Sequence, residues 1–233
     1  MDHPWKTQQH DPIQRLEDNL WNVDADIPGI PLRRRMVIVR RADGRLVVHN
    51  AVCVGEDALR EIEAWGEPAF LVVPSGFHRI DASRWAARYP RATVLAPARS
   101  AKRVRERVRV DGSFDALPAD PAVTLETLDG SKIGEGALAV RSGDRVSLVF
   151  NDTVMNNAHG RGLWWAVYRL IGSTGRPKVT PLIKLAGVNN RRALSAHLAR
   201  LAETPGLVRV LPGHGAIIDR DAPRVLREVA AGV

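Results

Sequence analysis

Hydrophobic residues recur along the chain in short runs with the two periods of regular secondary structure. Apolar residues at every third or fourth position predict helices over 56–65, 82–89, 163–171, 191–203 and 222–229. Shorter apolar runs, ended by Gly, Pro or polar residues, predict strands over 36–40, 45–49, 69–73, 93–96, 123–128, 137–141, 146–150 and 207–211. This order favours a single α/β domain with mixed sheets.

Turn and cap residues refine this pattern at three places. The Asp43-Gly44 pair joins the first two predicted strands as a β-hairpin, because a tight turn needs a residue with positive φ. Asn189 or Asn190 is a suitable N-cap for the helix that follows. Pro and Gly residues at 28–31 interrupt any regular element near the start. Residues 1–34 are therefore expected to form an extended lead-in packed on the domain, and 35–233 the domain itself.

Composition is that of an ordinary globular protein, with 45% hydrophobic and 26% charged residues among 233. The single cysteine, Cys53, excludes an internal disulfide and is expected to be a buried packing residue. The first ten residues are polar, with no apolar signal segment behind them. These features lead us to expect a cytoplasmic location.

The net charge of +8 is concentrated most densely in the arginine-rich segment 99–109. Helical spacing turns Ala101, Val104 and Val108 toward the core and leaves the cations on the surface. No aromatic residues interleave with them for base stacking, so a solvated helix face is favoured over nucleic-acid binding.

No apolar stretch approaches the ~20 residues that span a bilayer. The most apolar helical segment, 162–172, is expected to be a core or lid helix. Contact with a membrane surface is the alternative, but Arg169 is the only cation within the segment, and interfacial helices carry a strongly basic face.

Four residues that could bind one metal ion stand where apolar strands end: His78, Asp81, Asp152 and His214. Strand ends are where an α/β scaffold commonly holds chemical groups. Two imidazoles and two carboxylates suit one divalent ion, zinc first, with iron or manganese as alternatives. No nucleophile elbow, phosphate loop or dinucleotide fingerprint competes with this site.

Each of the four residues also has a structural interpretation. Asp81 precedes a predicted helix and could be its N-cap. His214 lies between two glycines and could be a turn residue that bonds to the backbone and has no other role. Asp152 could close a turn after Asn151. His78 could be a buried histidine with satisfied hydrogen bonds. His49 and His159 are weaker candidates for the site.

The order of elements and the loops at His78, Asp152 and His214 resemble the metallo-β-lactamase superfamily over roughly residues 35 to 225. More narrowly, the late Pro-Gly-His-Gly run resembles a branch in which the metal motif is reduced. The resemblance implies an αββα sandwich of two mixed sheets flanked by helices. It also implies a metal site at one edge of the two sheets.

Compared with the family's motif, the ligand set is incomplete. When His78 is set at the second histidine of the motif, Gly76, Ile80 and Asp81 stand at its other three positions. Asp152 matches the aspartate after a later strand and His214 the final histidine. An intermediate histidine is expected near 132–137, and that stretch has none.

This reduced set implies a mononuclear site, because two zinc ions need more ligands than remain. An active protein would hydrolyse an ester, thioester or amide of a small molecule, with Asp152 or Asp81 holding the attacking water. The alternative is a metal-free, catalytically inactive relative that binds a small acidic ligand through Arg79. Association with nucleic acid through 99–109 is a third, less supported class. The sequence leaves the oligomeric state and the substrate open.

Overall fold

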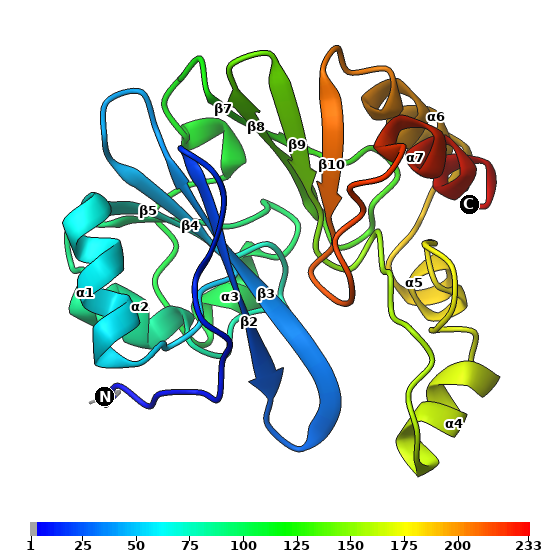
Figure 1. Ribbon diagram of the computed structural model, residues 1–233, viewed down its shortest axis with the longest axis horizontal. Coiled ribbons are helices and arrows are strands. Elements are labelled where there is room, and N and C mark those ends of the chain that lie inside the picture. The colour runs from blue at the N-terminus through cyan, green and yellow to red at the C-terminus, as the bar shows by residue number, and fades with distance from the viewer. Residues whose placement is uncertain (1–3) are drawn as a thin grey trace.

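Two mixed β-sheets pack face to face in the computed structural model, which describes residues 4–233 (Figure 1). The first sheet has the strand order β1 (Gln14–Glu17), β2 (Leu20–Ile27), β3 (Ile30–Arg40), β4 (Leu46–His49), β5 (Pro68–Val72) and β6 (Thr93–Leu95). The second has the order β10 (Leu207–Leu211), β9 (Arg145–Val149), β8 (Gly136–Ser142) and β7 (Val123–Thr127).

Helices cover the outer faces of both sheets, so the chain forms four layers (Figure 1). The first sheet is covered by α1 (Glu56–Trp65), α2 (Ala82–Arg88) and α3 (Ala101–Arg105). The second is covered by α6 (Arg191–Ala202) and α7 (Ala222–Ala231). Two short helices, α4 (Leu163–Leu170) and α5 (Pro181–Ala186), project at one end of the molecule. The predicted αββα architecture is confirmed.

Three separate clusters of buried apolar residues fill the spaces between the layers. One lies between the first sheet and α1 to α3 and includes Ile38 and Trp85. A second lies between the two sheets and includes Val72, Val149 and Leu211. The third, below α6 and α7, forms the rest of the core. Each sheet is thus buried on both faces, which explains why its central strands are apolar runs rather than alternating patterns.

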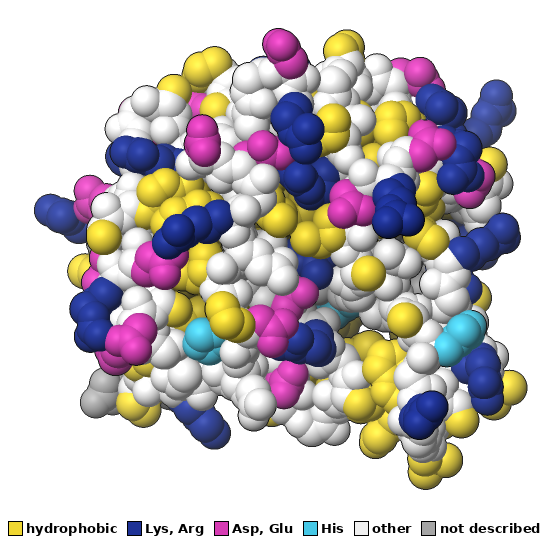
Figure 2. Space-filling view, in the orientation of Figure 1, with side chains coloured by type: hydrophobic (Ala, Val, Ile, Leu, Met, Phe, Trp, Pro, Cys, Tyr) yellow, Lys and Arg dark blue, Asp and Glu magenta, His cyan; other side chains and the backbone are white. Residues whose placement is uncertain are grey.

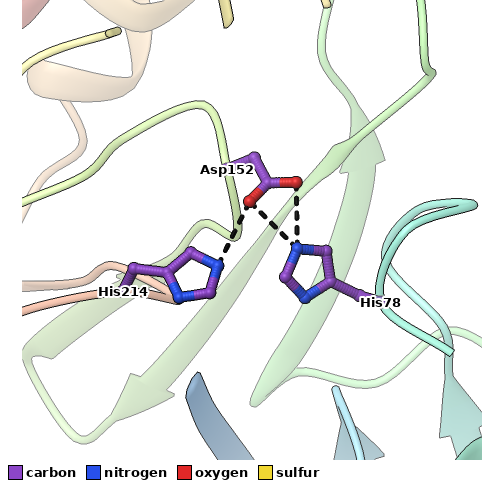
Figure 3. A group of neighbouring side chains, drawn as sticks. All are labelled: His78, Asp152 and His214. Atoms are coloured by element: carbon purple, nitrogen blue, oxygen red, sulfur yellow. Dashed lines mark hydrogen bonds and ion pairs between the residues drawn. The ribbon is translucent and has the colours of Figure 1, made fainter. Parts of the chain in front are cut away.

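Strand direction brings certain loops together at one edge of the sandwich. β5 runs parallel to β4 and β6 in the first sheet, and β10 runs parallel to β9 in the second. Parallel neighbours end at the same edge of a sheet, so the loops that follow β9 and β10 lie side by side. The loop after β5 approaches them from the other sheet (Figure 3).

Most elements form where the sequence predicts them. The hairpin between β3 and β4 is confirmed, and Gly44 in its turn has a φ of 82°. The N-cap at Asn190 is also confirmed, because its side chain accepts a hydrogen bond from the N–H of Ala193 at 3.0 Å. The arginine-rich segment buries Ala101, Val104 and Val108 as predicted, and its cations at 103, 105 and 107 lie on the surface.

Two expectations about regular structure are wrong in part. The stretch 1–34 contains β1, β2 and the start of β3, which belong to the six-stranded sheet, although residues 1–3 lie outside the described part of the chain. The Pro28-Gly29 interruption is a hairpin turn between two long strands. Of the two roles expected for α4, the core role is wrong, because none of its residues is buried, and the lid role stays a prediction. Within residues 4–233, no helix has the length and apolar character needed to cross a bilayer.

Candidate metal centre

His78, Asp152 and His214 meet at the edge where the loops after β5, β9 and β10 converge (Figure 3). One ligand atom from each residue lies within 4.8 Å of the others. The Nε2 atom of His78 is 2.9 Å from both carboxylate oxygens of Asp152, and Nε2 of His214 is 3.3 Å from Oδ1. Three of the four predicted ligands are therefore brought together, from positions 136 residues apart in the chain.

Close contact between two loops fixes the position of His214. The N–H of Gly213 donates to the carbonyl of Asn151, and the N–H of Asn156 donates to the carbonyl of His214. A Cβ atom at Gly213 would lie 2.7 Å from the Asn151 side chain, and one at Gly215 only 2.1 Å from the Asn156 carbonyl oxygen. Only glycine permits such an approach. The glycines on both sides of His214 thus hold it against the Asp152 loop.

A second hydrogen bond orients the His214 ring. Its Nδ1 lies 2.6 Å from the carbonyl oxygen of Arg33, which can only accept, so Nδ1 carries a proton. The neutral ring then presents an unprotonated Nε2 toward the Asp152 carboxylate. Two lone pairs 3.3 Å apart require a cation between them, either a proton or a metal ion. A backbone carbonyl behind a histidine is the usual arrangement for a metal ligand.

The electrostatics of the trio follow from burial and from mutual contact. Burial alone lowers the pKa of His214, but its hydrogen bond and ion pair with Asp152 outweigh burial and raise that pKa. Burial raises the pKa of Asp152, whereas the charge of His78 and hydrogen bonds from both histidines bring it well below its usual range. The site therefore holds a carboxylate that stays ionised, as metal coordination requires.

Glu135, which sequence reasoning missed, supports the Asp152 loop from below. Its fully buried carboxylate accepts hydrogen bonds from the backbone N–H groups of Asn151, Asp152 and Thr153, at 2.7 to 3.0 Å. Burial, followed by the negative charge of Asp152, raises the pKa of Glu135 to about 7. It lies in the stretch 132–137, where the family resemblance implied a histidine. The signal in the sequence was an acidic residue directly before an apolar strand.

Asp81, the fourth predicted ligand, is not part of this group. It is fully buried, and its carboxylate forms an ion pair with the buried Arg34. It also accepts from Arg84 at 3.0 Å and from the N–H of Cys53 at 3.1 Å. Its position is that of the N-cap of α2, but the side chain makes no capping hydrogen bond. Both of its oxygens are engaged by partners within the fold, and the carboxylate is fully buried away from the three donor atoms of the trio.

The weaker candidates also lie outside the trio. His49 is buried at the end of β4, and burial together with the nearby His78 lowers its pKa to about 3. His159 is exposed, and its Nδ1 is 2.9 Å from the Thr174 hydroxyl. Arg79, proposed to bind an acidic ligand, pairs with Glu106 at 2.8 Å. Cys53 is buried as expected, and burial raises the pKa of its thiol to about 12.

An apolar cavity of about 440 Å³ opens above the trio. Among the described residues, the charged or titratable side chains in its wall are Arg34, His78, Asp152 and His214. The rest of the wall is apolar, with contributions from the β2–β3 hairpin, the loop after β5 and α5. This wall includes Ile30, Phe77, Ile80 and Leu182. A small polar centre in an apolar cleft is the usual form of a small-molecule site.

The same fold is found in solved metallo-β-lactamase structures of low sequence identity. The DIM-1 enzyme exposed to ceftazidime is 13% identical, with a TM-score of 0.64 over 97% of this chain and 98% of that one. The enzyme from Pontibacter korlensis is 12% identical, with a TM-score of 0.62 over 97% and 100%. TMB-1 is 12% identical, with a TM-score of 0.64 over 96% and 97%. No protein-family model and no curated protein matches the chain.

The chain therefore has the metallo-β-lactamase fold in a divergent form. Its His78, Asp152 and His214 fit a single metal ion in three respects. The donor atoms are mutually close, Asp152 remains ionised, and the Nδ1 proton of His214 is fixed away from the site. Two imidazoles and one carboxylate form a catalytic-type set that suits zinc and equally suits iron(II) or manganese.

Proposed function

We propose that the protein is a mononuclear metal-dependent hydrolase that cleaves an ester, thioester or amide with an apolar acyl group. The convergence of the three donor atoms at the floor of an apolar cavity carries this proposal. Three protein ligands leave a coordination position open, which distinguishes catalytic zinc sites from structural ones. A bound divalent metal would supply Lewis-acid activation of a water molecule and of the scissile carbonyl group.

The side chains around the metal position divide the remaining tasks. His78 and His214 would hold the ion, and the Arg33 carbonyl keeps the His214 ring in the coordinating orientation. Asp152 would complete the ligand set, and its second oxygen is the acceptor available to orient water. Glu135 fixes the Asp152 loop through backbone hydrogen bonds, so it is a positioning residue rather than a catalytic one.

The cavity wall supports the choice of an apolar acyl group. Its side chains offer hydrophobic contact over most of the surface and no acceptor beyond the trio. Each methylene that enters such a wall contributes about 0.8 kcal/mol, or roughly a fourfold gain in kcat/KM. Turnover of p-nitrophenyl esters should therefore rise steadily from acetate to hexanoate. A flat or falling series would contradict an apolar acyl substrate.

Metal analysis tests the centre itself. Protein purified without chelator should contain about one equivalent of metal, in keeping with one three-ligand site. After chelator treatment, added zinc, iron(II) or manganese should raise the melting temperature, because an ion that binds only the folded state stabilises it. A metal-free preparation whose melting temperature does not respond to any of these ions would contradict the proposal. Ligand binding without metal would instead favour the inactive binding module.

Matched variants test the ligand assignment. Asp152→Ala and His214→Ala should abolish both metal binding and turnover while the fold persists. His159→Ala provides the control, because it removes an imidazole that bonds Thr174 rather than the trio. It should retain both properties. Equal loss of turnover in all three variants would contradict the assignment.

A further inference from the structure

Exposed hydrophobic side chains gather at one end of the molecule rather than being scattered. Among residues 4–233, ten large hydrophobic side chains are exposed, and seven of them belong to α4, its C-terminal end and α5. The other three, Ile30, Phe77 and Ile80, line the cavity above the trio. Monomeric soluble proteins rarely expose apolar side chains so contiguously unless the surface contacts a partner.

The outward face of α4 is apolar along its whole length. The large hydrophobic side chains exposed on α4 and its C-cap are Leu163, Trp164, Val167, Leu170 and Ile171, a spacing that places them on one side of a helix. Leu163 and Leu170 are 82% and 87% exposed, which is close to full exposure. On α5, Leu182 and Leu185 are 56% and 80% exposed and stand one turn apart. We call these seven side chains the α4–α5 surface.

The segment of the chain that carries this surface has basic side chains and no acidic ones. Residues 153–202 contain eight of the 34 basic side chains and none of the 26 acidic ones. The remaining 26 basic and 26 acidic side chains balance in total, with the basic excess of 99–109 offset by acidic side chains elsewhere, whereas 153–202 has no acidic side chain of its own. Figure 2 shows hydrophobic and basic side chains, without acidic ones, over the projecting end that α4 occupies in Figure 1.

Three of these cations converge beside α4. Arg176, Lys178 and Lys184 line a cavity of about 210 Å³ that begins at Gly172, directly after the helix. The one acidic residue in that wall, Glu228, is already paired with Arg224 at 2.5 Å. The cavity is thus a basic recess next to an apolar face. Arg161 and Arg169, before and within α4, are also exposed.

We infer that the α4–α5 surface docks the protein onto an anionic lipid bilayer. A helix that lies in the membrane interface buries its apolar face at the boundary of headgroups and acyl chains, while flanking cations contact anionic headgroups. Trp164 suits that layer, because tryptophan has an amphipathic ring and is enriched at membrane–water interfaces. The cations that such a surface needs come from neighbouring segments as well as from α4. The sequence of the helix alone has one cation and therefore argued against contact with a membrane.

Leu182 belongs both to the α4–α5 surface and to the wall of the cavity above the trio. The docking surface therefore adjoins the cavity wall at α5. The surface does not favour nucleic acid, because four of its five exposed α4 side chains are aliphatic and offer no base-stacking platform. Neither the exposure nor the charge of the α4–α5 surface depends on a metal ion at the trio.

Vesicle flotation with the full chain tests the inference. Binding to phosphatidylcholine vesicles with about 30% phosphatidylglycerol should be at least tenfold stronger than to phosphatidylcholine alone. It should also weaken when salt rises from about 0.05 to about 0.5 M, because the cations then act through a shorter screening length. The fluorescence of Trp164 should shift to the blue on binding. Equal binding to both vesicle types, or none, would overturn the inference.

Paired variants separate the surface from net charge. Arg176→Gln with Lys178→Gln should weaken binding roughly 30-fold, at about fivefold per cation. Arg60→Gln with Arg91→Gln removes the same charge from the region of α1 and α2, across the molecule from α4 (Figure 1), and should have less than about a twofold effect. Equal weakening in both pairs would overturn the inference.

A polar variant of the apolar face distinguishes a bilayer from a second copy of the chain. Leu163→Ser with Leu170→Ser should abolish vesicle binding and leave the size-exclusion profile and melting temperature unchanged, since neither residue is buried. A wild-type dimer that the same variant converts to a monomer, without anionic lipid binding in either protein, would assign the surface to self-association instead.

Discussion

Asp81 and Asp152 are two buried carboxylates with opposite surroundings. Asp81 is held by two arginines and a backbone N–H, and its partner Arg34 is itself only 1% exposed. Asp152 is held by two histidines and lies in the wall of the cavity. An arginine cannot release its proton under ordinary conditions, whereas a histidine can. The partners therefore make Asp81 part of a permanent structural ion pair, whereas the histidines beside Asp152 can release a proton and let a metal ion take its place.

The largest expected effect is on stability, at Asp81. In Asp81→Asn the buried Arg34 keeps its charge without a carboxylate, and breaking such a pair typically costs 3–5 kcal/mol, so we expect a loss of about that size. Urea denaturation would measure the change in the free energy of unfolding. The folded fraction should still bind one metal ion. Loss of metal binding with unchanged stability would reverse the assignment of the two carboxylates.

The histidines can be divided as the carboxylates are: His78 and His214 belong to the trio, whereas His49 lies outside it. The pH dependence of stability tests the assignment of His49. The pKa of His49 is lowered to about 3 by burial. The His49 side chain therefore remains neutral in the folded protein, whereas in the unfolded chain it binds a proton below a pH of about 6.5. Its contribution to stability is thus full above that pH and declines as the pH falls. By pH 5 the loss should reach about 2 kcal/mol. In His49→Gln this part of the pH dependence should disappear from urea denaturation curves; identical curves for both proteins would contradict it.

A smaller stability effect is expected at Asp152. In metal-free Asp152→Asn, both histidines can become neutral and continue to donate or accept hydrogen bonds, so no charge is stranded. The free energy of unfolding should change by about 1 kcal/mol, the scale of one hydrogen bond. Zinc should raise the melting temperature of the wild type and leave that of the variant unchanged. A destabilisation as large as that of Asp81→Asn would remove the contrast between the two carboxylates.

The sequence predicted the trio because its signals are local, and it failed at Asp81 because the deciding signal is not. His78, Asp152 and His214 each follow an apolar run, and parallel strands bring such ends together. Asp81 follows a run as well, but Arg34, which lies 47 residues away, occupies it across the fold. Nothing near Asp81 in the sequence indicates that partner. Glu135 was missed for a related reason, since its three backbone donors come from a loop 16 to 18 residues later.

The errors in secondary structure have physical causes of the same kind. β2 carries Asp24 and Asp26 among apolar residues, and these acids pair with Arg35 and Arg33 of the neighbouring strand. The two acidic residues make the β2 sequence resemble a polar lead-in, because their cross-strand partners lie outside the segment. The α4 helix has the apolar periodicity of a core helix, and the pattern cannot tell whether its face meets protein or something else. Helix existence was predictable; what the apolar face contacts was not.

The smallest effect is expected at Arg79, and it separates a hydrolase from a module that binds acidic ligands. Arg79 pairs with Glu106 near the surface instead of lining the cavity above the trio. Exposed pairs contribute little to stability, so Arg79→Gln should leave the melting temperature and the zinc affinity within experimental error of the wild type.

Isothermal titration with small carboxylates provides the contrasting measurement. Because the cationic side chains in the cavity wall are already paired, Arg34 with Asp81 and His214 with Asp152, the metal-free protein should bind such ligands poorly, and Arg79→Gln should not alter this. Tight binding of a carboxylate that the variant loses would show that Arg79 leaves Glu106 to recognise acidic ligands, and that the cavity serves recognition in place of hydrolysis.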